Sequence, residues 1–141
     1  MLNLEPTWIV DDSDIDRYIL RRQLKACGVV NILEFERASA LRQKLDELSE
    51  TSQNDEAFPR LIILDLNMPG ESGIQLLEAI QPYFAEGRLS DCAVFMYSGS
   101  DDPADIKAVE HFPMVSGFIN KGATPEQLQQ SLSALNQERD K

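Results

Sequence analysis

Residues 60–73, RLIILDLNMPGESG, are the stretch that decides the fold. Leu61 to Leu64 are apolar at every position, and Asp65 ends the run. A strand that is apolar at every position is usually buried on both faces, as in a parallel sheet. Ligands bind at the carboxyl ends of the strands in such sheets, which makes Asp65 a functional candidate. The alternative interpretation is a solvated aspartate that opens the turn at residues 67–70.

Length and composition limit the possible functions. The chain has 141 residues, which suggests one domain, and 43% hydrophobic residues, which is enough for a packed core. The net charge of -11 argues against direct nucleic-acid binding and against an anionic membrane surface, because both need clustered Lys and Arg. No signal peptide or membrane-spanning segment is recognisable. We therefore expect a cytoplasmic protein with no membrane insertion, in which Cys27 and Cys92 are reduced core residues.

The rest of the sequence alternates short apolar runs with helical patterns. Strands are expected at residues 7–10, 29–35, 61–64, 93–97 and 117–120. Helices are expected at residues 14–26, 38–48, 73–80, 103–111 and from 125 onward, with a polar loop at 51–58. Pro82 should end or kink the third helix, and the tail at residues 137–141 should fray. Five strand–helix units predict a doubly wound, flavodoxin-like α/β fold, with a five-stranded parallel sheet in the order 2-1-3-4-5 and helices on both faces.

The helix expected at residues 14–26 has two sides of different character. One side is an apolar stripe, expected to be buried, made of Ile15, Ile19, Leu20, Leu24 and Cys27. The other side is basic in an acidic chain and carries Arg17, Arg21, Arg22 and Lys25. Gly28 is placed to cap the carboxyl end of the helix. The basic side is interpreted either as an ordinary solvated surface or as a surface that docks an acidic partner.

Polar residues follow four of the predicted strands at the point where each strand ends. They are Asp11 and Asp12 after the first strand, Asp65 after the third, Ser98 after the fourth and Lys121 after the fifth. Because the first and third strands are neighbours in this order, three carboxylates should meet at one edge of the sheet. Such a group needs a proton or a cation, and an all-oxygen site suits Mg²⁺. With Mg²⁺ present, a carboxylate can form an aspartyl phosphate, whose oxygens Lys121 and Ser98 can bind.

Four motifs at these strand ends resemble those of the response-regulator receiver domain of bacterial two-component signalling. They are Val10-Asp11-Asp12-Ser13, LDLNMPG at residues 64–70, Tyr97-Ser98-Gly99 and Phe118-Ile119-Asn120-Lys121. The resemblance covers essentially the whole chain and implies a single receiver domain, residues 1–141, with no attached effector domain. It also implies the strand order given above, which a chemotaxis member of this family has.

The resemblance implies roles for the acidic residues. Asp65 would be the phosphoacceptor. Mg²⁺ would be held by Asp12, Asp65 and the backbone carbonyl of Asn67, with Asp11 acting partly through water. Lys121 would pair with a phosphoryl oxygen.

The resemblance also implies a conformational switch. Ser98 would be the hydroxyl that moves to meet the phosphoryl group, and Phe118 would be the aromatic side chain whose position reports that movement. Plain core packing is the alternative interpretation of Phe118. Asn67 and Ser100 match positions that tune how long the phosphoryl group lasts.

The sequence departs from the family pattern in two places. Gly122 follows Lys121, where the family usually has proline, and this removes a restraint on the loop. The loop at residues 51–58 is longer than the family usually has between the second helix and the third strand. The remaining site residues match, so an active receiver is expected rather than an inactive pseudo-receiver.

The expected function is that of a stand-alone response regulator. A phosphohistidine on a sensor histidine kinase or a histidine phosphotransfer protein would donate its phosphoryl group to Asp65. The phosphorylated chain would then bind a downstream protein or form a homodimer. It would be a signalling switch that catalyses only its own phosphorylation and dephosphorylation.

Three alternative functions stay open. The first is a phosphorelay intermediate that passes the phosphoryl group to a histidine phosphotransfer protein; His111 is interpreted as a structural or surface residue and not as a relay site. The second is a phosphohydrolase with an aspartyl phosphate, which needs a second acid where this chain has Asn67. The third is a flavodoxin-like binder, which needs a phosphate-cradling loop where this chain has Asp11 and Asp12.

Overall fold

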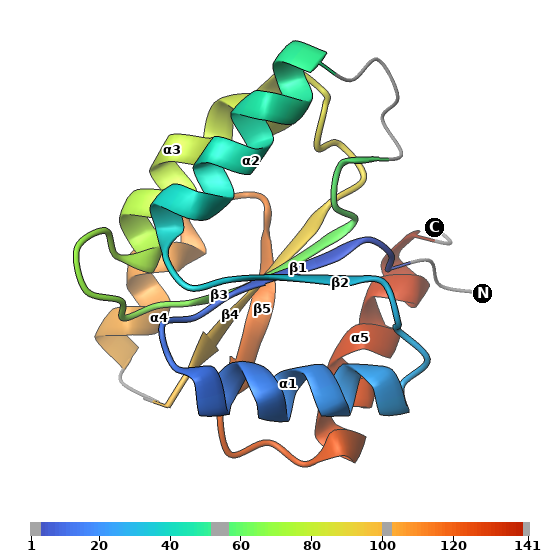
Figure 1. Ribbon diagram of the computed structural model, residues 1–141. Helices are drawn as coiled ribbons and strands as arrows, with labels where there is room; N and C mark the ends of the chain where they lie inside the picture. Colours follow the sequence, from blue (N-terminus) through green and yellow to red (C-terminus); the bar gives the residue numbers. More distant parts are fainter. Residues whose placement is uncertain (1–3, 52–56, 100–102, 140–141) are drawn as a thin grey trace.

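The strands predicted from the sequence form one parallel sheet in the computed structural model (Figure 1). The structure describes residues 4–51, 57–99 and 103–139, with side chains up to Leu135. The strands are β1 (Thr7–Val10), β2 (Ile32–Phe35), β3 (Leu61–Asp65), β4 (Ala93–Ser98) and β5 (Val115–Asn120). Their order is β2-β1-β3-β4-β5, and each neighbouring pair is parallel. The predicted doubly wound order is confirmed.

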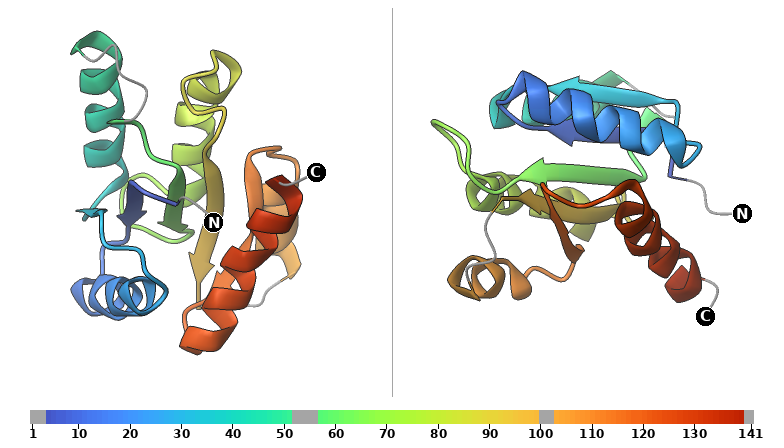
Figure 2. Two further views of the ribbon diagram at one scale, coloured as in Figure 1. Left: turned by 90° about the vertical axis from the view of Figure 1, so that its right-hand side faces the viewer. Right: turned by 90° about the horizontal axis from the view of Figure 1, so that it is seen from below.

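Helices cover both faces of this sheet. They are α1 (Asp14–Ala26), α2 (Ala38–Thr51), α3 (Gly73–Ala85), α4 (Pro103–Glu110) and α5 (Pro125–Arg139). α1 and α5 lie on one face, and α2, α3 and α4 lie on the other (Figure 1 and Figure 2). β3 contributes Leu61 and Ile63 to the core on the α1–α5 face, and Ile62 and Leu64 to the core on the opposite face. This double burial explains the unbroken apolar run.

β2 is shorter and β5 is longer than the sequence predicted. β2 begins at Ile32 because the backbone N–H groups of residues 29–31 donate to the Leu24 carbonyl and the Glu5 carboxylate instead of pairing with a strand. β5 begins at Val115, two residues before the predicted start at Gly117.

α3 continues through Pro82 to Ala85, where the sequence predicted an end or a kink. A proline removes only one N–H donor from a helix. Pro82 is exposed and lies near the end of α3, so the loss of this one hydrogen bond costs little stability. α2 extends to Thr51. Residues 52–56 of the predicted loop lie outside the described part of the chain, as do the last two residues of the tail, and its fraying stays a prediction.

α1 buries a different stripe from the one predicted. Leu20 and Leu24 are buried, but Ile15 and Ile19 are 72% and 39% exposed. Arg17 completes the buried side, because it lies three and seven residues before those two leucines and so points to the same side of the helix. The predicted stripe was right for Leu20 and Leu24 and wrong for Ile15 and Ile19, because the sequence of a helix does not show which of its sides will face the sheet.

Two residues of the predicted basic side are instead paired within the fold. Arg17 and Arg21 both form ion pairs with Glu34 of β2. The cap predicted at Gly28 is confirmed, since this residue follows the end of α1 with a φ of +92°. Of the two cysteines predicted to lie in the core, Cys92 is buried, whereas the other, which follows α1, is half-buried.

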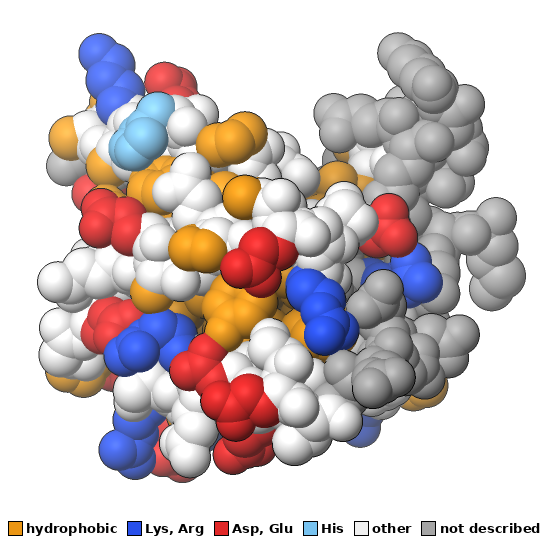
Figure 3. Space-filling view, turned by 90° about the horizontal axis from the view of Figure 1, so that it is seen from above, with side chains coloured by type: hydrophobic (Ala, Val, Ile, Leu, Met, Phe, Trp, Pro, Cys, Tyr) orange, Lys and Arg blue, Asp and Glu red, His pale blue; other side chains and the backbone are white. Residues whose placement is uncertain are grey.

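The surface carries charges of both signs. In the part of Figure 3 formed by described residues, both acidic and basic side chains lie around a small hydrophobic centre. Among the described residues, every helix is too short or too polar to cross a bilayer.

Candidate functional site

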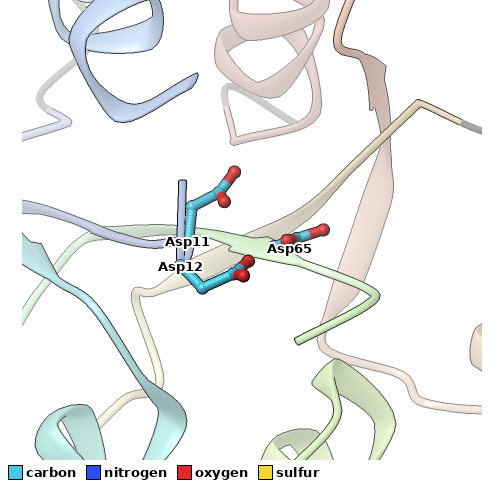
Figure 4. Close-up of side chains that lie close together, drawn as sticks. All are labelled: Asp11, Asp12 and Asp65. Carbon is cyan, nitrogen blue, oxygen red and sulfur yellow. The ribbon is translucent and has the colours of Figure 1, made fainter. Parts of the chain in front are cut away.

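β1 and β3 are neighbours that end side by side. Val10 pairs with Leu64, so Asp11 follows β1 next to the place where Asp65 ends β3. One carboxylate oxygen from each of Asp11, Asp12 and Asp65 lies within 4.8 Å of the other two. Figure 4 shows these three side chains gathered at one edge of the sheet. The predicted meeting of three carboxylates is confirmed, with two of the acids buried and Asp12 exposed.

Two similar turns orient the buried carboxylates. Asp11 Oδ1 accepts a hydrogen bond from the Ser13 N–H at 2.9 Å, and Asp65 Oδ1 accepts one from the Asn67 N–H at 3.2 Å. In each residue the second oxygen, Oδ2, lies on the side of Lys121. The turn that follows each strand therefore fixes which carboxylate oxygen faces the centre of the site.

Lys121 brings a positive charge to this group, as the sequence predicted. Its Nζ lies 2.9 Å from Asp11 Oδ2 and 3.5 Å from Asp65 Oδ2. Its backbone N–H donates to the Ser98 carbonyl at 2.9 Å, which places the residue at the end of β4. The same ammonium also lies 2.8 Å from Asp16 Oδ2, a contact that the sequence did not indicate.

The loop after Lys121 is closed without the proline that is usual in the family. The Gly122 N–H donates to Asn120 Oδ1 at 2.7 Å, and the Ala123 N–H donates to the Asn120 carbonyl at 2.9 Å. A proline at position 122 could not make the first of these bonds, because it has no N–H. Hydrogen bonds restrain this loop where a proline ring is absent.

The pKa values in the site reflect its unbalanced charge. Burial, followed by the charge of Asp11, raises the pKa of Asp65 to about 7, although Lys121 and the Asn67 N–H oppose that shift. Burial by itself lowers the pKa of Lys121, but its interactions with Asp16 and Asp11 outweigh burial and raise it above the ordinary value. The site therefore favours a proton or an additional cation.

The acidic group fits a hard divalent cation. All of its candidate ligand atoms are carboxylate oxygens, the donors that Mg²⁺ prefers. Asp11 Oδ2 is buried, and its contact with Lys121 is an ion pair without hydrogen-bond geometry. One ammonium cannot balance three carboxylates, so a metal ion at this position would neutralise charge that the fold leaves uncompensated.

The other predicted residues lie at different places around this group. Ser98 ends β4 at the same edge of the sheet and is 2% exposed. Asn67 is exposed in the turn after β3. Phe118 is half-buried against the core on the α2–α3–α4 face, so its packing partners are those of a core residue. Ser100 lies outside the described residues.

Three residues that contact the site were not predicted to do so. Asp16 contacts the lysine, Arg17 donates to the backbone carbonyl of Asp11, and Gly73 packs against the backbone of Asp65. The spacing of Arg17 with the buried leucines could have indicated its burial. Asp16 has only the local pattern of an acid in the first turn of a helix, which points to capping and not to a site.

The comparison with known families agrees with this geometry. The family described as the response regulator receiver domain matches residues 7–133, and the chain belongs to that family. It is therefore a phosphorylation-dependent signalling module of two-component systems. The chemotaxis protein CheY1 of Helicobacter pylori strain J99 is 26% identical to the chain over 127 residues, which are 90% of this chain and 93% of that relative.

Solved structures are similar over almost the whole chain. A two-component response regulator from Cytophaga hutchinsonii shares the fold with a TM-score of 0.77 and 24% identity, over 93% of this chain and 96% of that one. The isolated receiver domain of RcsB from Salmonella enterica serovar Typhimurium, studied in the presence of the phosphomimetic BeF3-, has a TM-score of 0.71 and 26% identity. That match covers 93% of this chain and 87% of the RcsB chain.

Proposed function

We propose that this receiver is phosphorylated on Asp65 by a phosphohistidine of a partner protein. The observation that carries the proposal is the position of Asp65, which is buried beside two further acids with its Oδ2 3.5 Å from the Lys121 ammonium. This arrangement supports a carboxylate nucleophile with both a cation site and a fixed positive charge next to it.

Four residues support binding of Mg²⁺ in this site. Asp12, Asp65 and the backbone carbonyl of Asn67 would hold the ion, with Asp11 acting partly through water. When bound, Mg²⁺ offsets the repulsion between the attacking carboxylate and the phosphoryl oxygens.

The transfer forms one bond and breaks one bond. An Asp65 oxygen attacks phosphorus while the phosphorus–nitrogen bond of the phosphohistidine breaks, and the leaving imidazole keeps the electron pair and takes up a proton from water. Lys121 would pair with a phosphoryl oxygen, and the Ser98 hydroxyl would donate a hydrogen bond to another.

α1 supports docking of the phosphodonor. Among the described residues, the large hydrophobic side chains that are exposed all lie on α1, on β2 or just before it, and they are Ile15, Tyr18, Ile19, Val30 and Leu33. α1 begins at Asp14, directly after the acidic turn, so Ile15, Tyr18 and Ile19 lie near the site, whereas Val30 precedes the end of β2 that is far from it. Exposed hydrophobic patches mark protein interfaces. We assign this one to a sensor histidine kinase or a histidine phosphotransfer protein.

The output of the switch is assigned to the edge of the sheet formed by β5, opposite the edge formed by β2. Phosphorylation would move Ser98 and Phe118 and so alter the surface of α4, β5 and α5. That surface would bind a downstream protein or a second copy of the chain. Asn67 and Ser100 would tune the lifetime of the phosphoryl group.

Labelling with acetyl phosphate tests the central claim. With Mg²⁺ present, intact-protein mass spectrometry should show one added phosphoryl group on the wild-type chain and on Asp14→Asn, but none on Asp65→Asn. Rapid turnover of the donor without a lasting phosphoprotein would instead favour a phosphohydrolase. Flavin binding without labelling would favour a flavodoxin-like binder.

Transfer from histidine kinases tests the partner and the docking surface separately. Ile15→Glu should slow transfer from a cognate phosphorylated kinase while leaving acetyl phosphate labelling unchanged, and Lys25→Ala should change neither. Acceptance from no kinase of the source organism would refute the partner assignment and leave the metal site standing. Onward transfer to a histidine phosphotransfer protein would favour the phosphorelay function.

A further inference from the structure

Lys121 lies closer to a residue outside the acidic triad than to Asp65. Its ammonium donates a hydrogen bond to Asp16 Oδ2 at 2.8 Å, whereas its distance to Asp65 Oδ2 is 3.5 Å. A lysine that binds a phosphoryl group on Asp65 must therefore weaken or share its contact with Asp16.

Asp16 is held on the first turn of α1. Its backbone N–H donates to Oγ of Ser13, the N-cap residue, at 3.2 Å. A carboxylate at this place is also favoured by the amino end of the helix. Its side chain is 29% exposed, so the contact with Lys121 is partly shielded from solvent.

α1 makes a second contact with the loop that follows Lys121. Gln23 Nε2 donates to the Ala123 carbonyl at 2.9 Å. The contact between Asp16 and Lys121 joins residues 105 positions apart, so α1 and the β5–α5 loop are tied at two points. These contacts restrain a loop that has Gly122 in place of the usual proline.

We propose that Asp16 is a positioning residue that holds the Lys121 ammonium in a resting position and thereby restrains phosphorylation of Asp65. This inference rests on the proposed function and adds a residue of α1 to it. Phosphoryl oxygens on Asp65 compete with the Asp16 carboxylate for the same ammonium. Removal of that carboxylate should release Lys121 toward Asp65.

The Asp16→Asn variant tests this restraint against a matched control. With saturating Mg²⁺, we expect its affinity for beryllofluoride, measured by calorimetry, and its initial rate of acetyl phosphate labelling to rise about fivefold. Asp14→Asn removes the same charge from the same helical turn, but Asp14 is exposed and pairs with Arg17. It should match the wild-type chain. Equal effects of the two variants, or weaker binding by Asp16→Asn, would overturn the proposal.

A double-mutant cycle separates positioning from simple charge removal. In a Lys121→Met background, Asp16→Asn should leave beryllofluoride affinity unchanged, because the lysine through which it acts is gone. If the gain persists in that background, Asp16 acts on the bound anion directly and the proposal is wrong.

A measurement without metal or phosphodonor reports the position of the lysine itself. The side-chain nitrogen signal of Lys121 in the NMR spectrum should move in Asp16→Asn and stay in place in Asp14→Asn, with circular dichroism showing that both variants are folded. An unmoved signal refutes the restraint. If the wild-type chain binds no beryllofluoride and takes up no phosphoryl group, the proposed function fails, and this signal still decides whether Asp16 holds Lys121.

Discussion

Asp65 is a carboxylate in a place where ionisation is costly. It is 3% exposed, and Asp11, also buried, carries charge beside it. Lys121 offsets part of that cost but divides its charge among three carboxylates. In the metal-free protein, an ionised Asp65 should therefore lower the free energy of unfolding, and this electrostatic penalty can be measured.

The pH dependence of stability should show that penalty. The pKa of Asp65 is about 7 in the folded chain and near 3.8 when unperturbed. Between these values the folded state keeps a proton that the unfolded state has lost, so stability falls as the pH rises, and the full penalty is present above about pH 7. Asp65→Asn should raise the free energy of unfolding by about 2 kcal/mol at pH 8 without metal, and by little near pH 4.

Urea unfolding of the two proteins across this pH range checks the prediction. Asp14→Asn, which alters an exposed acid, should give a nearly constant difference from wild type. If Asp65→Asn were less stable than wild type at pH 8, the predicted electrostatic penalty at Asp65 would be wrong.

At the scale of the elements, the site depends on how α1 and α3 are attached to the strand ends. Arg17 of α1 donates to the backbone carbonyl of Asp11 and pairs with Glu34 of β2. At the start of α3, Gly73 donates its N–H to the Leu66 carbonyl at 3.0 Å. The helices therefore hold the backbone segments that carry the acids.

Replacement of Arg17 should loosen the first of these attachments. Arg17→Met leaves the Asp11 carbonyl without this donor and the nearby acids with one fewer counter-charge, so the free energy of unfolding should fall by about 2–3 kcal/mol. Mg²⁺ affinity should fall as well. Arg22→Met is the control, because Arg22 is exposed and contacts Tyr18, and it should stay within about 0.5 kcal/mol of wild type. Equal losses for the two variants would refute a special role for the buried arginine.

Replacement of Gly73 should disturb the second attachment. A Cβ at this position would lie 2.5 Å from the Asp65 carbonyl oxygen and 2.9 Å from Leu66 Cα, both of them backbone atoms. Gly73→Ala should therefore cost about 2 kcal/mol and weaken Mg²⁺ binding, because the backbone of Asp65 must shift. Denaturant unfolding and calorimetric metal titration measure the two effects. Glu78→Ala, on the exposed side of α3, should change both very little, and a harmless Gly73→Ala would show that the backbone can relax.

The molecule as a whole is strongly acidic, with a net charge of -11. This charge opposes the compact state, and the three clustered acids add to that repulsion at one edge of the sheet. Ions of any kind should screen the general repulsion, whereas a metal bound to the acidic group should add a specific contribution.

Mg²⁺ should therefore stabilise the fold more than its contribution to ionic strength explains. At about one hundred times its dissociation constant it should raise the free energy of unfolding by about 2.7 kcal/mol relative to NaCl of equal ionic strength. Asp12→Asn should lose most of this gain, since it removes one of the three candidate ligands. Identical stabilisation by the two salts would mean that the acids hold no metal.

Local patterns were sufficient to predict the parallel sheet and the place of the site, whereas the strand order also followed from the resemblance to the receiver family. The apolar run before Asp65 indicated a strand buried on both faces, and the acids at residues 11, 12 and 65 indicated a shared edge. These predictions depend on strand burial and on parallel pairing, which a short stretch of sequence encodes.

Only the tertiary structure decided which side of α1 is buried and what holds Lys121. Ile15 is exposed and Arg17 is buried because the sheet and Glu34 of β2 determine how the helix is rotated about its axis, and neither is encoded within α1. Likewise, Asp16 reaches Lys121 across 105 residues, through the packing of α1 and α5 on one face. Periodicity and turn residues act between neighbours in the chain, whereas these contacts depend on the relative placement of whole elements.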